Sequence, residues 1–139
     1  MSFKKIKATA KKNDYEFIHV KKTTSTMSNV RNFLDNKNKN CIIISDQQTN
    51  GRGQRGKNWI SPKGNIYCSI SFKNFLDIKE HFLFSILIAV SIKMSLNKFT
   101  SENIKFKWPN DIFFKNKKLG GIVAENYNNA SSNFMILGF

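Results

Sequence analysis

The stretch GRGQRGKNWISPKGN, residues 51–65, decides how this 139-residue chain is interpreted. Three glycines and three cations fall within the seven residues from Gly51 to Lys57, shortly after the apolar run Cys41–Ile44. Such a segment offers too little apolar surface to build a core. It can wrap backbone N–H groups and positive charge around an anion, because glycine permits tight backbone conformations. The segment therefore predicts an anion-binding loop between two strands.

Length and composition predict one globular domain. Forty per cent of the residues are hydrophobic and 13% are aromatic, which excludes a disordered chain. The two cysteines, Cys41 and Cys68, each lie in an apolar run and are interpreted as reduced core residues of a cytoplasmic protein. Residues 1–13 lack the apolar segment of a secretory signal, and the apolar run 82–90 is too short to span a bilayer. We therefore expect a soluble protein without a membrane partner.

The formal charge of +14 admits two interpretations. One is a basic nucleic-acid-binding module, and the other is compositional bias. The bias interpretation is favoured, because the chain has 20 Lys and 18 Asn but only 3 Arg, and the lysines are scattered. Two of the three arginines, Arg52 and Arg55, lie in the Gly-rich segment, where forked anion recognition would use them.

Hydrophobic periodicity predicts an α+β fold, with a mixed or antiparallel sheet packed against helices. Residues 1–13 are expected to form a basic N-terminal segment, and residues 14–139 the folded domain. A long functional loop is expected at residues 46–64. The helix at 78–99 is apolar nearly all round and is expected to be the central core helix. The remaining expected elements are a helix at 27–35 capped by Ser25 or Thr26, strands at 15–20, 41–45, 65–72, 104–108 and 134–137, and a hairpin of 112–114 with 119–125 around the turn 115–118.

A second motif, Lys107-Trp108-Pro109-Asn110-Asp111, would by itself predict only a strand that ends in a turn. In combination with the Gly-rich segment, it makes the chain resemble the biotin protein ligases. The family motif GRGRRGR-x-W-x-SP-x-GN-x-Y-x-S is matched from Gly51 through Ser69, and the family's KWPND is matched at 107–111. Further matches are Lys117–Ile122 with Glu125, Gln48–Asn50, and a weaker one at Thr24–Met27.

The resemblance implies a catalytic domain with a fold like that of class II aminoacyl-tRNA synthetases, and a two-step reaction. ATP, with Mg²⁺, adenylates biotin, and biotin then passes to a lysine of the biotin carboxyl carrier domain of acetyl-CoA carboxylase. Carried over by motif, Lys118 and Arg52 are the catalytic residues, and no metal ligands are assigned. The biotin-site residues are Ser25, Thr26, Met27, Gln48, Gly51, Arg52, Gly53, Gln54 and Lys118. The nucleotide-site residues are Arg52, Arg55, Trp59, Lys107, Asn110 and Asp111.

Three departures from the family pattern have expected consequences. Gln54 stands where many members have Arg, so we expect weaker retention of biotinyl-AMP. Met27 stands where Asn is usual, which predicts weaker binding of biotin. Family members also continue beyond the position of Phe139 into further helices and a small β-barrel. We therefore expect an incomplete catalytic domain with an unpaired terminal strand, and no specific DNA binding, since a helix-turn-helix segment is missing as well.

Four points stay open at the level of sequence. A lipoate or octanoyl transferase shares the fold and the acyl-to-lysine chemistry, although GRGQRG and KWPND argue against it. A basic nucleic-acid-binding module is the alternative of another class. An inactive remnant of a ligase is the third alternative. A homodimer is compatible with all of them.

Overall fold

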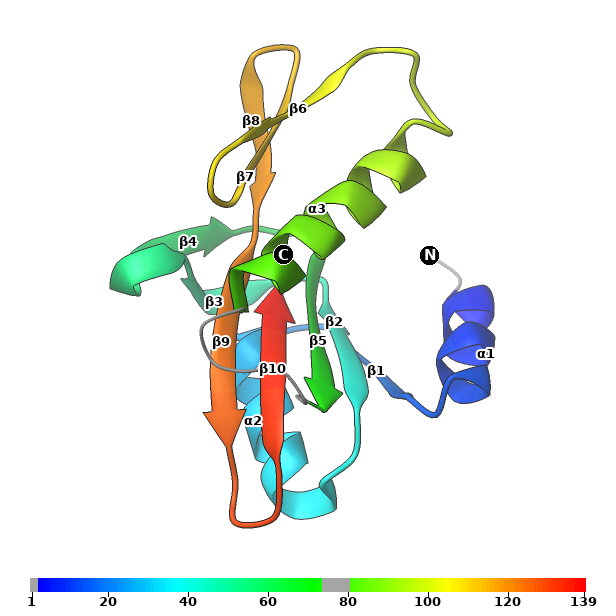
Figure 1. Cartoon of the computed structure of the whole chain (residues 1–139), viewed down its shortest axis with the longest axis vertical. Coiled ribbons are helices and arrows are strands. Elements are labelled where there is room, and N and C mark those ends of the chain that lie inside the picture. The colour runs from blue at the N-terminus through cyan, green and yellow to red at the C-terminus, as the bar shows by residue number, and fades with distance from the viewer. Residues whose placement is uncertain (1–2, 74–80) are drawn as a thin grey trace.

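The computed structural model describes residues 3–73 and 81–139 and contains one five-stranded sheet and two smaller ones (Figure 1). The order in the large sheet is β1-β2-β5-β10-β9, where β1 and β2 are parallel and the other pairs are antiparallel. Its strands are β1 (Glu16–Val20), β2 (Cys41–Ser45), β5 (Tyr67–Lys73), β9 (Val123–Asn128) and β10 (Asn133–Gly138). The helices are α1 (Lys4–Lys12), α2 (Thr26–Lys37) and α3 (His81–Leu96).

Helices cover both faces of the large sheet. Helix α2 lies behind it in Figure 1 and α3 in front of it. Met27, Val30 and Leu34 of α2 form one core cluster with Ile43 and Phe134. The second cluster joins the other face of the sheet to α3, with Met135 and Leu137 at its centre. The predicted α+β class is confirmed.

Strand β5 buries its serine face more completely than its apolar face. Ser69 and Ser71 are fully buried against the first core cluster, whereas Ile70 and Phe72 are only partly covered. The serines are tolerated there because each has a partner. Ser71 Oγ accepts a hydrogen bond from the backbone N of Cys41 at 2.8 Å, and Ser69 Oγ lies 2.7 Å from Thr26 Oγ1. Buried hydroxyls stabilise a core only under that condition.

The two smaller sheets stand at one end of the large sheet (Figure 1). The first is the ribbon of β3 (Gln48–Arg52) and β4 (Asn58–Ser61), joined through a short 3₁₀ turn at Gln54–Gly56. The second is the three-stranded sheet of β6 (Ile104–Lys107), β7 (Asp111–Phe114) and β8 (Lys117–Gly121). No helix among the described residues is long and apolar enough to cross a membrane.

Most of the predicted elements are confirmed to within a few residues, but the loop predicted at 46–64 is wrong. Much of it forms the β3–β4 ribbon, because Gly53 N donates to Lys57 O at 2.6 Å and closes the turn. The segment is polar, so periodicity gave no strand signal, yet strand pairing satisfies its backbone. Residues 4–12 of the basic N-terminal segment are helical, which was not predicted.

Two expectations in the C-terminal half also need correction. The predicted strand 119–125 is two strands, β8 and β9, that belong to different sheets. The break falls at Ile122, whose N donates to Asn110 O at 2.8 Å. The terminal strand is not unpaired, because β10 is hydrogen-bonded to β5 on one side and to β9 on the other. The turn of the hairpin, predicted at residues 115–118, consists of Lys115 and Asn116 alone. Both have positive φ, as a tight two-residue turn requires.

Helix α3 is not the enclosed central helix that its composition predicts. Phe84, Ile88 and Ile92 pack against the second core cluster. A stripe on the other side is exposed, and its members are Leu83, Ile86, Leu87, Val90 and Met94. The predicted start of this helix, residues 78–80, lies outside the described residues.

Candidate active site

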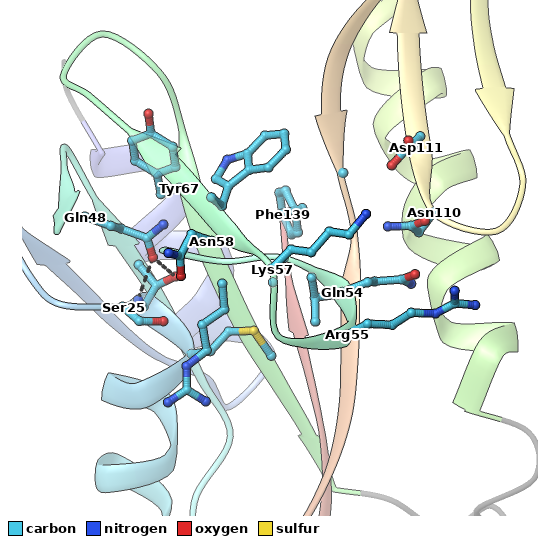
Figure 2. Close-up of a pocket in the computed structure, with 18 of the residues that line it drawn as sticks. Ser25, Gln48, Gln54, Arg55, Lys57, Asn58, Tyr67, Asn110, Asp111 and Phe139 are labelled. Atoms are coloured by element: carbon cyan, nitrogen blue, oxygen red, sulfur yellow. Dashed lines mark hydrogen bonds between the residues drawn. The ribbon is translucent and has the colours of Figure 1, made fainter. Parts of the chain in front are cut away.

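A cavity of about 410 Å³ lies where the two small sheets meet the end of the large sheet. Figure 2 shows Gln48 and Tyr67 on one side, Asn110 and Asp111 on the other, and Arg55 and Lys57 reaching across between them. The volume suits a small-molecule ligand. The lining residues are Ser25, Thr26, Met27, Gln48, Arg52, Gly53, Gln54, Arg55, Lys57, Asn58, Trp59, Tyr67, Pro109, Asn110, Asp111, Lys118, Gly121, Val123, Gly138 and Phe139.

One wall of the cavity is a hydrogen-bond network centred on Gln48. Its Oε1 accepts from Thr26 N at 2.8 Å and from Thr26 Oγ1 at 3.1 Å. Its Nε2 donates to Ser61 Oγ at 3.0 Å, and Ser61 Oγ donates to Trp59 O at 3.0 Å. The side chain of Gln48 therefore ties the start of α2 to the β3–β4 ribbon. Backbone hydrogen bonds from Thr49 N to Thr23 O and from Asn50 N to Thr24 O, both 2.9 Å long, also hold the ribbon against the segment before α2.

Two further residues hold the same wall in place. A Cβ on Gly51 would lie 2.4 Å from Trp59 O and 2.5 Å from Ser61 Oγ, so the ribbon can close only around a glycine. Tyr67 Oη donates to Pro62 O at 2.7 Å and accepts from Asn65 Nδ2 at 3.1 Å. This pair of contacts fixes the loop between β4 and β5 behind the cavity.

The opposite wall carries an ion pair. Lys118 Nζ lies 2.8 Å from Asp111 Oδ1 and 5.0 Å from the centre of the Trp59 ring. In the paired strands β7 and β8, Asp111 is opposite Gly121 and Lys118 is opposite Phe113, so the two charged residues are diagonal neighbours on one face. Asn110 Nδ2 donates to Ile122 O at 3.2 Å and fixes the turn before β7. The lysine thus bridges both walls.

The charge inside the cavity is strongly positive. Arg52, Arg55, Lys57 and Lys118 line it, and Asp111 carries the single side-chain carboxylate among the lining residues. Three of the four cations come from the ribbon and its 3₁₀ turn, where Arg55 adopts a positive φ of 55°. Since a carboxylate and a polyphosphate repel each other in water, a cavity of this charge can hold both at once.

The structure gathers most of the predicted site residues around one cavity. Gly51 and Lys107 are the exceptions, because neither is a lining residue: Gly51 is buried in the ribbon and Lys107 is exposed on β6. Met27 does line the cavity, but it is 3% exposed, and its Sδ would lie 2.9 Å from a Cβ on Gly138. Met27 is therefore a packing residue as well as part of the wall.

Several lining residues were not predicted. Tyr67 and Gly121 lie within the quoted motifs, which could have pointed to them. Lys57, Asn58 and Pro109 also lie within the quoted motifs, so the same signal applied to them. Val123, Gly138 and Phe139 reach the cavity only because β9 and β10 end beside it, and no local pattern predicts that contact.

The cavity offers few ligands for a divalent metal. No cluster of three or more His, Cys, Asp or Glu exists among the described residues. Asp111 and Asn110 both line the cavity and still suit Mg²⁺, which is usually held by one or two carboxylates together with substrate phosphates. The fit is to a metal that arrives with its nucleotide.

The chain is similar to known proteins in both sequence and fold. Residues 17–139 match the family model described as biotin/lipoate A/B protein ligase family. The bifunctional ligase/repressor BirA of Escherichia coli is 34% identical over 83 residues, which are 59% of this chain and 26% of that protein. The biotin protein ligase of Leishmania major in complex with biotin superposes with a TM-score of 0.71 at 23% identity, over 88% of this chain and 55% of that one.

A second solved relative resembles the chain at higher identity. The biotin protein ligase of Aquifex aeolicus in complex with biotin and ATP superposes with a TM-score of 0.66 at 25% identity, over 89% of this chain and 51% of that one. The chain thus spans about half the length of these solved relatives and about a quarter of the E. coli protein.

Proposed function

The chain belongs to the biotin/lipoate A/B protein ligase family, and from that premise we propose that its cavity binds biotin and ATP and supports ATP-dependent biotinylation of a protein lysine. The proposed acceptor is the biotin carboxyl carrier domain of acetyl-CoA carboxylase. We place the activity in the cytoplasm, where the free thiols Cys41 and Cys68 would remain reduced.

The observation that carries the proposal is the bridging position of Lys118. It lies between Asp111 on one wall and the Trp59 ring on the other, in a cavity lined by three more cations. An ammonium at this place can contact a carboxylate and a phosphate that meet in the middle of the cavity. As a compact charge on a flexible stem, it can follow negative charge as that charge moves.

The proposed reaction has two steps. In the first, a biotin carboxylate oxygen attacks the α-phosphorus of ATP, the bond from phosphorus to the bridging oxygen breaks, and pyrophosphate leaves. Lys118 and Arg52 offset the charge that gathers on the phosphoryl oxygens. In the second, a neutral lysine amine attacks the acyl carbon of biotinyl-AMP, the bond from that carbon to the phosphate oxygen breaks, AMP leaves, and the amine loses a proton.

Other residues bind and shield rather than react. The hydroxyls of Ser25 and Thr26 suit the neutral urea of biotin, which needs donors and acceptors but no charge. The Trp59 ring offers an aromatic face to the adenine. Mg²⁺, when bound with the nucleotide by Asp111 and Asn110, would supply further charge neutralisation. The ribbon around Gly53 can exclude water from the labile anhydride.

Calorimetric titration with biotin, with and without ATP, tests the proposal on this chain. We expect biotin to bind and lipoate not to compete with it. Competition by lipoate would instead favour the lipoate or octanoyl transferase alternative. Biotin-dependent exchange of pyrophosphate into ATP then measures the first step. Lys118→Met should lower that exchange by about 10²–10³-fold, the usual effect of removing one preorganised contact.

The matched control is Lys117→Met, which changes the neighbouring lysine on β8 that does not line the cavity. Exchange should stay near that of the wild type. Equal losses in both variants would contradict the role proposed for Lys118, and a chain that binds lipoate but not biotin would contradict the proposed substrate.

A further inference from the structure

One face of the β6–β8 sheet continues the cationic wall of the cavity outward. In the register of this sheet, Lys105 is opposite Phe113, and Phe113 is opposite Lys118. Lys107 is opposite Asp111. Directly paired residues project from the same face of an antiparallel sheet. Lys105 and Lys107 therefore share a face with the two residues of the cavity's ion pair.

This face, defined by Lys105, Lys107, Phe113 and Lys118 and called the outer face below, is accessible. Lys105 and Lys107 are both exposed, and the β6–β8 sheet projects away from the body of the molecule (Figure 1). The one carboxylate on the outer face, Asp111, is already paired with Lys118. The two outer lysines therefore present positive charge to any molecule that approaches the cavity from this side.

The opposite face of the same sheet has a different character. Ile104 is buried in the second core cluster and is opposite Phe114, which in turn is opposite Lys117. Lys117 thus projects from the core-side face, although it is exposed as well. The sheet therefore carries two exposed lysines on different faces. Lys105 shares a face with the Asp111–Lys118 ion pair of the cavity, and Lys117 does not.

We propose that the outer face is the docking surface for the acceptor protein, and that it selects an acceptor domain with an acidic surface beside its target lysine. This rests on the proposed function, since it concerns the second substrate of that reaction. The acceptor must bring a lysine amine into a cavity lined by four cations, and an acidic surface would offset that repulsion. A positive surrounding also favours the neutral form of the incoming amine, the form that attacks.

Another basic element offers a useful comparison. Helix α1 carries five exposed lysines and no acidic residue, and it is more densely charged than the outer face. None of its residues lines the cavity. Unspecific attraction to a polyanion such as nucleic acid would use α1 at least as much as β6. Acceptor docking predicts that the position of the charge, rather than its amount, decides binding.

The test measures affinity for an unbiotinylated carrier domain from acetyl-CoA carboxylase, by fluorescence anisotropy at low salt. Lys105→Glu should weaken binding about tenfold, the effect of reversing one charge several ångströms from another in water. Lys117→Glu, with the same charge change on the other face, should stay within about twofold of the wild type. Lys105→Gln should give a smaller loss in the same direction, and unchanged thermal melts show that the variants fold.

Other outcomes overturn the inference. Equal losses in the two Glu variants would mean that bulk charge alone acts. Tighter binding to a single-stranded oligonucleotide than to the carrier domain, lost on Lys105→Glu, would make the outer face a nucleic-acid surface. Biotin titrated into each variant separates this inference from the function. If biotin binds but Lys105→Glu and Lys117→Glu weaken carrier binding equally, only the docking surface is contradicted. If the two variants differ in carrier binding but biotin does not bind, only the proposed ligand is contradicted.

Discussion

Gln48 shows how the structure changes the interpretation of a single residue. The motif assigns it to biotin, but its amide is already bonded to Thr26 and to Ser61. In the structure the side chain of Gln48 holds Thr26 and the β3–β4 ribbon in place. A neutral amide can do this because it donates and accepts at the same time.

Gly51 gives a direct test of how tightly that ribbon is packed. Gly51→Ala places a Cβ against Trp59 O and Ser61 Oγ, both too close for a normal contact. We expect the free energy of unfolding to fall by about 1–3 kcal/mol, as in other overpacked sites. Gly120→Ala on β8 is the matched control, because a Cβ there has nothing within 4 Å. Urea unfolding of both variants measures the difference, and equal stabilities would contradict the packing argument.

Gln54 is the position where this chain can be brought closer to its family. It lies in the 3₁₀ turn and lines the cavity. Gln54→Arg adds a charge-assisted contact to the adenylate, which should slow the release of biotinyl-AMP about fivefold. Asn50→Arg adds the same charge on β3 outside the lining and should leave release unchanged. Radiolabelled adenylate trapped on a filter gives both rates, and equal rates would contradict the role of position 54.

At the scale of elements, α3 differs most from its prediction. A helix that is apolar all round predicts complete enclosure, but only one side of α3 contacts the described core. Leu87 and Ile88 are neighbours in sequence and lie on different sides. Leu87 is 62% exposed, whereas Ile88 packs against the second core cluster.

This pair of neighbours tests which side of α3 stabilises the molecule. Ile88→Ala should lower the free energy of unfolding by about 2 kcal/mol, because it removes packed methyl groups. Leu87→Ala should change it by less than about 0.5 kcal/mol, as for other exposed sites. Alanine is a good helix former in both cases, so helix propensity does not separate them. Thermal unfolding provides the comparison, and a larger loss for Leu87→Ala would show that its side of the helix is covered.

The elements also show what could be predicted from sequence and why. Strands such as β2 and β10 were predictable, because buried strands are continuous apolar runs. The β3–β4 ribbon was not, since its residues are polar and its pairing depends on Gly51 and on the turn at Gly53. The lining of the cavity was largely predictable, because most of its residues lie in the quoted motifs. Phe139 and Gly138 were not, because they reach the cavity through sheet order alone.

At the scale of the whole molecule, the central position of β2 and β5 in the large sheet governs the chemistry of the two thiols. Cys41 is fully buried and Cys68 nearly so. Burial raises the pKa of the Cys41 thiol to about 11 and that of Cys68 to about 12, from an ordinary value of 9.0. Neither is poised for catalysis, since a reactive cysteine needs a lowered pKa and access to solvent.

Two consequences follow for the folded protein. At pH 8, a thiol reagent should label Cys41 and Cys68 only as fast as the chain unfolds, because opening the central strands requires global unfolding.

The free energy of unfolding should also fall as the pH rises above about 9. Above that value the unfolded chain loses its thiol protons while the folded chain keeps them, so each unit of pH then favours unfolding by about 1.4 kcal/mol per thiol. The loss should continue until the pH approaches the folded pKa values of about 11 and 12.

Replacing Cys68 by Ala separates this effect from the ionisation of lysines and tyrosines in the same range. The variant is expected to be less stable at pH 7, because it leaves a small cavity. The fall in its free energy of unfolding between pH 8 and pH 11 should nevertheless be smaller than in the wild type, since one of the two thiols that resist ionisation is gone. Parallel urea titrations across that range provide the comparison. Identical pH profiles, or rapid labelling of both thiols in the folded chain at pH 8, would show that β2 and β5 are not the protected centre of the sheet.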